Sequence, residues 1–242
     1  DTPISTQVTA ADPGDVLLNV RALERKSNDP FGTSLKKVAL ELRKGEIVGI
    51  AGVAGNGQDE LLKALSGEIL ADAGSISLDG QRIENLAPDQ RRNLGIAIVP
   101  EERLGRGAVP NMSLADNALL TASGQGLVNR GLICFGRVRE FSREVIRRFG
   151  VRCNGENSTA GSLSGGNLQK YIIGREVLQN PRLLVASHPT WGVDVGSAVA
   201  IHKALVQLRD EGAAIVLISE DLDELYQLCN RLGALCDGRL SP

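Results

Sequence analysis

A glycine-rich stretch, Gly52–Leu62, has the residue types and the spacing of a loop that binds phosphate. Its sequence, GVAGNGQDELL, fits the pattern G-x-x-x-x-G with an additional inner glycine. Glycines let consecutive backbone N–H groups curl around an anion, and a helix that begins near Gln58 would direct its positive end to the same place. The residues predicted to bind a nucleotide are Gly52, Gly55, Asn56, Gly57, Gln58 and Asp59.

Two positions in this loop depart from the full phosphate-binding pattern, G-x-x-x-x-G-K-[S/T]. Gln58 replaces the lysine, so that a neutral hydrogen bond stands in for a charge-assisted one, a loss of about 1 to 2 kcal/mol. Asp59 replaces the hydroxyl residue that binds magnesium, and a carboxylate about 4 Å from a phosphate costs about 4 kcal/mol unless a cation intervenes. We therefore expect weak binding of ATP and Mg²⁺, with Asp59 as a candidate metal ligand.

A second motif, LSGGNLQK at Leu163–Lys170, marks the start of a predicted helix. Ser164 suits the N-cap position, and Gly165 and Gly166 would let an anion approach the backbone closely. The stretch LLVASHPT at Leu183–Thr190 follows, and it predicts a buried strand that ends before a proline. By themselves these residues indicate only a capped helix followed by a strand.

The elements that must position these motifs alternate between apolar runs and helical patterns. The predicted strands are Val16–Val20, Val38–Leu42, Ile47–Ala51, Ser75–Leu78, Ile96–Val99, Leu183–Ala186, Ile215–Ser219 and Leu232–Cys236. Several are continuously apolar, which predicts a largely parallel sheet buried on both faces, whereas the turn Leu78–Gln81 predicts an antiparallel hairpin. Arg137–Phe149 and Leu168–Leu178 have the apolar spacing of helices.

The composition is that of an ordinary globular chain and narrows the possible partners. A net charge of −2 over 242 residues and an aromatic content of 3% offer nucleic acid neither a basic field nor many stacking side chains. The apolar runs are too short to cross a bilayer. The cysteines lack C-x-x-C spacing, which favours reduced thiols buried as small hydrophobic side chains over disulfides or a zinc site.

The order of the motifs resembles the nucleotide-binding domain of ABC transporters: a glycine loop, an LSGG helix start, then an apolar strand that ends in Pro-Thr. The resemblance covers nearly all of Val16–Leu240. It implies an α/β P-loop NTPase of the ABC type, with a mostly parallel core sheet, an antiparallel β-subdomain and an inserted helical subdomain at about residues 113–180. Residues 1–15 are expected to be a linker, and residues 16–242 the nucleotide-binding domain.

Further stretches resemble one branch of this family, the C-terminal ATPase half of tandem ATPases in bacterial importers for sugars and nucleosides. These stretches are VPEER at Val99–Arg103, the LSGGN form of the signature, and ISEDLDE at Ile218–Glu224. AGVAGNGQ, Ile201–His202 and SEDLDEL together favour the nucleoside branch. The resemblance implies three partners: the N-terminal ATPase half of the same polypeptide, transmembrane permease subunits and, indirectly, a solute-binding protein. It also implies a peripheral location on the cytoplasmic face of the membrane.

The catalytic positions depart from the family pattern, so no catalytic residue is assigned. Ser187 and His188 stand where the family has an aspartate that holds magnesium and a glutamate that polarises the attacking water. Glu220 occupies the switch position, where many members have a histidine, and Trp191 replaces an arginine. Losing a general base removes about 10² to 10⁴ in rate. His188 could itself serve as the base, but packing or hydrogen bonding near the loop is the favoured interpretation.

A hydrolase triad made of Ser187, His188 and Asp194 is a further alternative. It is disfavoured because adjacent residues on a strand point to opposite faces. Counted against the family pattern, Gln58 and Asp59 remove two positive units, and Ser187 and a neutral His188 restore two. The hypothesis that follows is that the two motifs changed together, with Asp59 taking over part of the role that Ser187 gave up.

The signature is intact, in contrast with the catalytic positions. In the family, each signature completes the nucleotide site of a facing ATPase domain, and the D-loop residue, here Asp194, follows nearby. The chain is therefore expected to lend its signature in trans while its own site is weak or inactive. The alternative is a structural or regulatory ABC-like module that binds no nucleotide. The signature residues are Leu163, Ser164, Gly165, Gly166 and Asn167.

Overall fold

The computed structural model describes residues 14–27 and 32–241. Most of the predicted linker at residues 1–15 lies outside the described residues. Within the described part of the chain, the central layer is a six-stranded sheet in the order β12-β11-β3-β10-β9-β6. Its strands are β3 (Ile47–Ala51), β6 (Ile96–Val99), β9 (Leu183–Ser187), β10 (Ala214–Ser219), β11 (Arg231–Cys236) and β12 (Arg239–Ser241).

The pairing within this sheet confirms the mostly parallel core. The pairs β11·β3, β3·β10, β10·β9 and β9·β6 are all parallel, and β12 alone pairs antiparallel, through the tight turn after β11. The loops after β3, β10 and β9 consequently leave the sheet at the same edge and side by side. These are the loops that carry the phosphate-loop, switch and Pro-Thr motifs.

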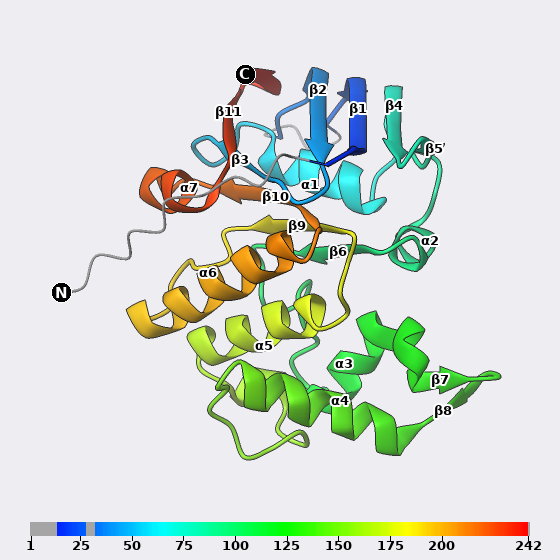
Figure 1. Ribbon diagram of the computed structural model, residues 1–242, viewed down its shortest axis with the longest axis vertical. Helices are drawn as coiled ribbons and strands as arrows, with labels where there is room; N and C mark the ends of the chain where they lie inside the picture. Colours follow the sequence, from blue (N-terminus) through cyan, green and yellow to red (C-terminus); the bar gives the residue numbers. More distant parts are fainter. Residues whose placement is uncertain (1–13, 28–31, 242) are drawn as a thin grey trace.

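A second sheet forms the antiparallel β-subdomain that the resemblance implied. Its strand order is β2-β1-β4-β5, from β1 (Val16–Arg25), β2 (Leu35–Arg43), β4 (Ala73–Leu78) and β5 (Gln81–Arg82). The predicted hairpin at Leu78–Gln81 is confirmed, because Leu78 pairs with Gln81 and the turn residues Asp79 and Gly80 have φ of 51° and 79°. The sheet lies beside α1 at the top of the molecule in Figure 1.

The helices divide between the core and a lower unit, which packs against the core through α5 (Figure 1). The core helices are α1 (Gln58–Ser66), α2 (Pro88–Asn93), α6 (Val195–Asp210) and α7 (Leu222–Leu228). The lower unit consists of α3 (Leu114–Ala122), η1 (Ser123–Leu127), the hairpin β7 (Val128–Asn129) and β8 (Leu132–Ile133), α4 (Phe135–Arg148), η2 (Ala160–Ser162) and α5 (Gly165–Val177). None of the helices in the described ranges is long and apolar enough to span a membrane.

The central sheet is buried on both faces, as its continuous apolar runs predicted. In β9, Leu183 and Val185 pack in one hydrophobic cluster with α1 and the antiparallel sheet. Leu184 and Ala186 point the other way and pack in a second cluster with α5 and α6. Because side chains alternate along a strand, a run without polar residues serves both clusters at once.

The predicted end of the first strand and a prediction about the cysteines need correction. β1 extends to Arg25, beyond the predicted end at Val20, because its irregular pairing continues along both neighbouring strands past that point. The described cysteines are free thiols, but Cys236 is exposed and the others are only half-buried. Cys236 lies on β11 next to the two-residue turn to β12, where one face of the sheet meets solvent.

Candidate functional site at the glycine loop

The glycine loop joins β3 to α1 as predicted, and it is closed by its own side chains. Gly57 is the N-cap of α1 and has φ of 106°, a left-handed conformation that favours glycine. The side chain of Gln58 is buried and folds back into the loop, where its Oε1 accepts a hydrogen bond from the backbone N–H of Asn56 at 3.0 Å. Its Nε2 donates to the Val53 carbonyl at 2.9 Å. Gln58 therefore occupies a backbone donor that a phosphate would use.

A second loop amide is occupied by the residue at the switch position. Glu220 follows β10 directly, and its Oε1 accepts a hydrogen bond from the Ala54 amide at 2.5 Å. A carboxylate oxygen on a backbone N–H is the arrangement that a bound phosphate oxygen would make at the same amide. The phosphate loop thus holds an anion supplied by the chain itself.

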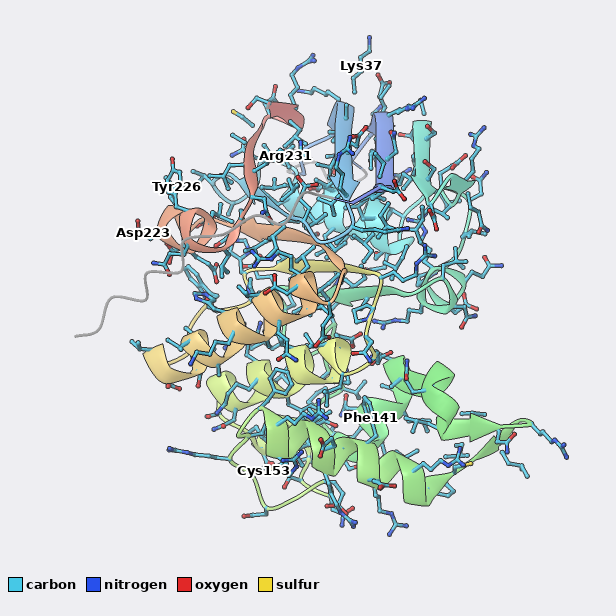
Figure 2. All side chains as sticks on the ribbon, in the orientation of Figure 1. Lys37, Phe141, Cys153, Asp223, Tyr226 and Arg231 are labelled. Carbon is cyan, nitrogen blue, oxygen red and sulfur yellow. The ribbon has the colours of Figure 1, made fainter. Side chains whose placement is uncertain are left out.

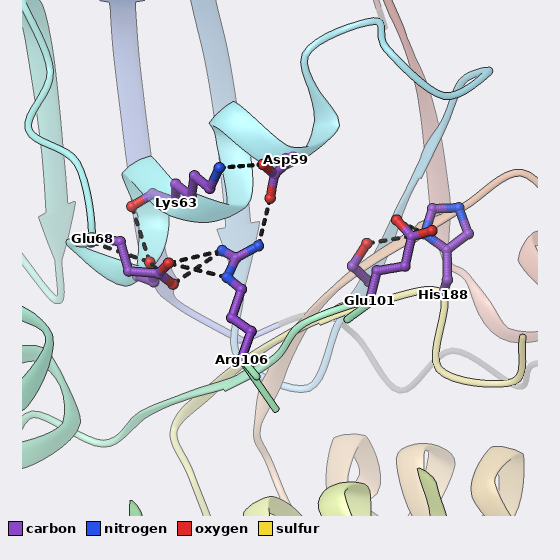
Figure 3. A network of polar contacts seen from close by, with 8 residues as sticks. Asp59, Lys63, Glu68, Glu101, Arg106 and His188 are labelled. Carbon is purple, nitrogen blue, oxygen red and sulfur yellow. Dashed lines mark hydrogen bonds and ion pairs between the residues drawn. The ribbon is translucent and has the colours of Figure 1, made fainter. Parts of the chain in front are cut away.

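The carboxylate of Asp59 is neutralised by two cations (Figure 3). Lys63, one turn along α1, lies 2.5 Å from Oδ2, and Arg106 lies 2.6 Å from Oδ1. Burial raises the pKa of Asp59, but the hydrogen bonds from Lys63 and Arg106 outweigh it and hold the pKa below its ordinary value. Arg106 also binds Glu68, so one guanidinium ties both ends of α1 to the segment after β6.

The Ser187–His188 pair requires a correction to the sequence analysis. The two side chains do not point to opposite faces: Ser187 Oγ lies 3.0 Å from His188 Nδ1. β9 ends at Ser187, and His188 turns the chain with φ of 47°, so the alternation of a strand no longer applies. Glu101 Oε2 lies 3.5 Å from the same nitrogen, Nδ1 (Figure 3).

This arrangement still provides no hydrolase triad. A triad needs its serine and its carboxylate on different imidazole nitrogens, whereas Ser187 and Glu101 both face Nδ1. Asp194, the predicted third member, is the N-cap of α6 and accepts hydrogen bonds from the Ser197 amide and hydroxyl. His188 instead packs edge-on against Trp191, with ring centroids 6.3 Å apart, in agreement with the favoured interpretation that it packs and hydrogen-bonds near the loop.

The signature residues begin α5 at the position that the sequence indicated, with one difference. Ser164 is the N-cap residue, but its side chain makes no capping hydrogen bond to the helix backbone. Its Oγ instead accepts a hydrogen bond from Asn167 Nδ2 at 2.9 Å, and Asn167 Oδ1 accepts one from the Arg152 amide. The first turn of α5 is therefore left without the side-chain cap that a serine often provides.

The segment after β6 connects the motifs, and no local pattern in the sequence indicates a role for its arginines. Glu101 reaches His188, Arg103 reaches α5 and the loop after β9, and Arg106 reaches α1. The stretch Glu101–Arg106 contains two acids and two arginines. Charged residues concentrated directly after a buried strand could have indicated a functional segment. The local sequence does not indicate which partner each of these side chains contacts.

A buried carboxylate behind the site was also missed. Glu224 on α7 accepts hydrogen bonds from Thr190 Oγ1 at 2.6 Å and Ser219 Oγ at 2.8 Å, and it contacts His202 Nε2 at 3.0 Å. Burial raises the pKa of Glu224, but the hydrogen bonds from His202, Thr190 and Ser219 outweigh it and lower the pKa. This cluster fixes the Pro-Thr loop, the end of β10 and two helices to one another.

The fold and this arrangement of motifs define an ATP-binding cassette. The sequence model of the ABC transporter family matches residues 35–191, and the chain belongs to that family. It is 42% identical over 236 residues to the nucleoside import ATP-binding protein NupA of Lactococcus lactis, covering 97% of this chain and 46% of that protein. It is 38% identical to the guanosine import ATP-binding protein NupO of Bacillus subtilis, with the same coverage of 97% and 46%.

A further relative agrees with this assignment, and a solved structure shares the fold. The ribose import ATP-binding protein RbsA 1 of Rubrobacter xylanophilus is 37% identical, over 95% of this chain and 45% of that protein. The dimeric post-hydrolysis structure of the ATP-binding cassette MJ0796 has the same fold, with a TM-score of 0.81 at 22% identity over 93% of this chain and 97% of that chain. The chain spans about half the length of the curated relatives that it matches.

The family generally binds ATP with Mg²⁺. The residues of this site fit the phosphates of ATP better than they fit Mg²⁺. The loop has the backbone shape for a phosphate, but the amides of Ala54 and Asn56 already have acceptors from Glu220 and Gln58. Magnesium fits poorly, because Asp59 is bound by two cations and Ser187 carries no charge. Among the described residues there is no group of three or more His, Cys, Asp or Glu side chains that could hold a metal ion.

Proposed function

We propose that the chain is one ATPase domain of a bacterial ABC importer for nucleosides or simple sugars, with nucleosides favoured. In this proposal its own site binds ATP and Mg²⁺ weakly and does not turn ATP over. Its signature completes the active site of a facing ATPase domain, the N-terminal half of the same polypeptide. The pair acts at the cytoplasmic face of the membrane on permease subunits, which receive solute from a binding protein.

One contrast between two parts of the molecule carries this proposal. Two backbone N–H groups of the phosphate loop, those of Ala54 and Asn56, already donate to side chains of this chain, whereas Ser164 makes no capping hydrogen bond to the first turn of α5. A helix start without a cap leaves backbone donors available to an anion from outside the chain. The nucleoside importer NupA, at 42% identity, supports the substrate class.

Exposed apolar side chains support a protein partner at the edge of the sheet that carries the motifs. Val53 follows β3, Trp191 follows β9 and Leu222 follows β10, with exposed fractions of 73%, 63% and 52%. These loops leave adjacent parallel strands, and large apolar side chains exposed together are typical of an interface. Tyr226, also exposed, projects from α7 in Figure 2.

Two measurements test the proposal. The chain alone should bind ATP weakly, with or without Mg²⁺, and should not hydrolyse it; rapid turnover would refute the inactive site. In the complete ATPase, Gly166→Asp should abolish turnover, because a carboxylate would take the place of the phosphate at the helix start. A Cβ on Gly166 would have only ordinary contacts, the nearest at 3.7 Å, so the uncharged Gly166→Asn is a matched control that should retain more activity.

The competing structural module predicts a different result. If Gly166→Asp and Gly166→Asn both left ATP hydrolysis and solute uptake unchanged, the signature would have no role in trans. If the chain also failed to bind ATP in the complete ATPase, a structural or regulatory module would be the better description.

A further inference from the structure

The guanidinium of Arg103 lies at the first turn of the signature helix. Its Nε donates to Gln169 Oε1 on α5 at 3.1 Å, and its Nη2 donates to the carbonyl of Trp191. A Cβ placed on Gly165 would lie 2.5 Å from Arg103 Nη1. Arg103 therefore occupies the space between the helix start and the loop after β9.

The charge of Arg103 is not balanced by an acid in the described part of the chain. Its hydrogen-bond partners are a side-chain amide and a backbone carbonyl, whereas Arg106, on the same segment, binds both Asp59 and Glu68. Burial lowers the pKa of Arg103. The carboxylate of Asp194, close to Gly166, is already hydrogen-bonded to Ser197.

Two further features at this place favour an anion. The start of α5 carries the positive end of the helix dipole, and Ser164 does not cap it, so a partly buried cation and a positive helix end lie together. Gln169, whose amide meets Arg103, is 1% exposed, and its Nε2 has no hydrogen-bond partner among the described residues. An anion at this place would offset the repulsion between the Arg103 guanidinium and the positive start of α5. It would also accept hydrogen bonds from N–H donors that lack a partner.

We propose that Arg103 binds the terminal phosphate of the ATP held by the facing ATPase domain, together with the signature. The inference rests on the proposed function, because only a facing domain would bring a nucleotide to this turn. A guanidinium suits the task, since it stays charged when partly buried and can offer paired N–H donors to phosphate oxygens. Because ADP lacks this third, γ-phosphate, Arg103 favours ATP over ADP at the partner's site.

The test compares the complete ATPase with its Arg103→Ala and Arg103→Lys variants. The KM for ATP and the inhibition constant for ADP are measured at the partner's site. For Arg103→Ala we expect the preference for ATP over ADP to fall by about tenfold to a hundredfold, the range for a charge-assisted hydrogen bond. Arg103→Lys should recover part of it. Arg137→Ala, which removes an exposed arginine that contacts the Gly126 carbonyl, is the charge-matched control and should change neither constant.

The outcomes separate this inference from the proposed function. If Gly166→Asp stops turnover but Arg103→Ala leaves the preference for ATP unchanged, the role of Arg103 is wrong and the signature still acts in trans. If Arg103→Ala weakens ATP and ADP binding equally, Arg103 only supports the fold of the site, and the inference fails. If Gly166→Asp also has no effect, both proposals fail.

Discussion

Glu220 Oε1 lies 2.5 Å from the backbone nitrogen of Ala54, although the two residues are 166 positions apart in the sequence. Parallel pairing of β3 with β10, in which Ala51 is opposite Ser219, brings the loops after both strands together. The switch residue of this chain is therefore a ligand of its own phosphate loop. A phosphate that bound the same backbone N–H would have to displace this carboxylate and would be repelled by it.

Replacing Glu220 should consequently improve nucleotide binding. We expect Glu220→Ala to lower the Kd of the chain for ATP by about threefold to tenfold, because an amide donor is freed and a negative charge is removed. Titration calorimetry of the isolated chain measures the change. Asp223→Ala removes a nearby exposed carboxylate on α7 (Figure 2) and should leave the Kd almost unchanged. Equal effects of the two variants would mean that only net charge matters.

Gln58→Lys should have opposite effects on stability and on affinity. A lysine cannot accept the Asn56 hydrogen bond, and a buried ammonium group without an anion should lower the free energy of unfolding by about 1 to 2 kcal/mol. With the donor free and a charge restored, the affinity for ATP should rise about tenfold or more. Urea unfolding with and without ATP measures both effects.

Gln58→Met is the control for the variant at that position. It keeps a similar size and frees the backbone N–H of Asn56 but adds no charge, so it should destabilise the loop and improve ATP binding much less than the lysine does. If the lysine variant bound ATP no better than the methionine variant, the missing lysine would not be what limits affinity.

The ion pair between Asp59 and Arg106 should contribute measurably to stability. Both side chains are only partly buried, so the coupling free energy in a double-mutant cycle of Asp59→Ser and Arg106→Ala should be about 0.5 to 1 kcal/mol. Chemical denaturation of the two single variants and the double variant measures it. Strictly additive effects would mean that Arg106 does not hold Asp59. Asp59 would then be available for the role exchange with Ser187 that the charge count suggested.

Glu224 should make stability depend on pH. Its pKa is lower in the folded chain than in the unfolded one, so its contribution is complete above the ordinary carboxyl pKa of about 4.3 and is lost as the pH falls through the folded value. At pH 7 we expect Glu224→Gln to lower the free energy of unfolding by about 2 to 4 kcal/mol. The gap between variant and wild type should narrow as the pH falls below that ordinary value.

Urea unfolding at a series of pH values checks this prediction. Glu211→Gln is the control, because Glu211 is exposed and accepts a single hydrogen bond, from Gln207. A gap that stayed constant down to pH 3 would mean that the carboxylate form of Glu224 is not what stabilises the fold.

Local features of the sequence were sufficient to predict the main elements. Continuous apolar runs such as Leu183–Ala186 identify strands that are buried on both faces, and the turn at Leu78–Gln81 identifies a hairpin. The glycines around Gly57 and the start of the signature helix at Gly165 were also predicted correctly. Each of these features follows from a local pattern. Apolar residues in sequence mark a buried strand, and glycines mark the turns and helix starts that need their backbone freedom.

Only the tertiary structure decided what the site residues contact. Glu220 meets Ala54, Arg106 meets Asp59, and Arg103 reaches the signature helix, each across a long stretch of sequence. These distances are fixed by the strand order β3-β10-β9-β6, which brings the loops together at one edge of the sheet. Charged side chains have many possible partners of opposite charge in a sequence, and the pairing depends on which loops the sheet places within reach.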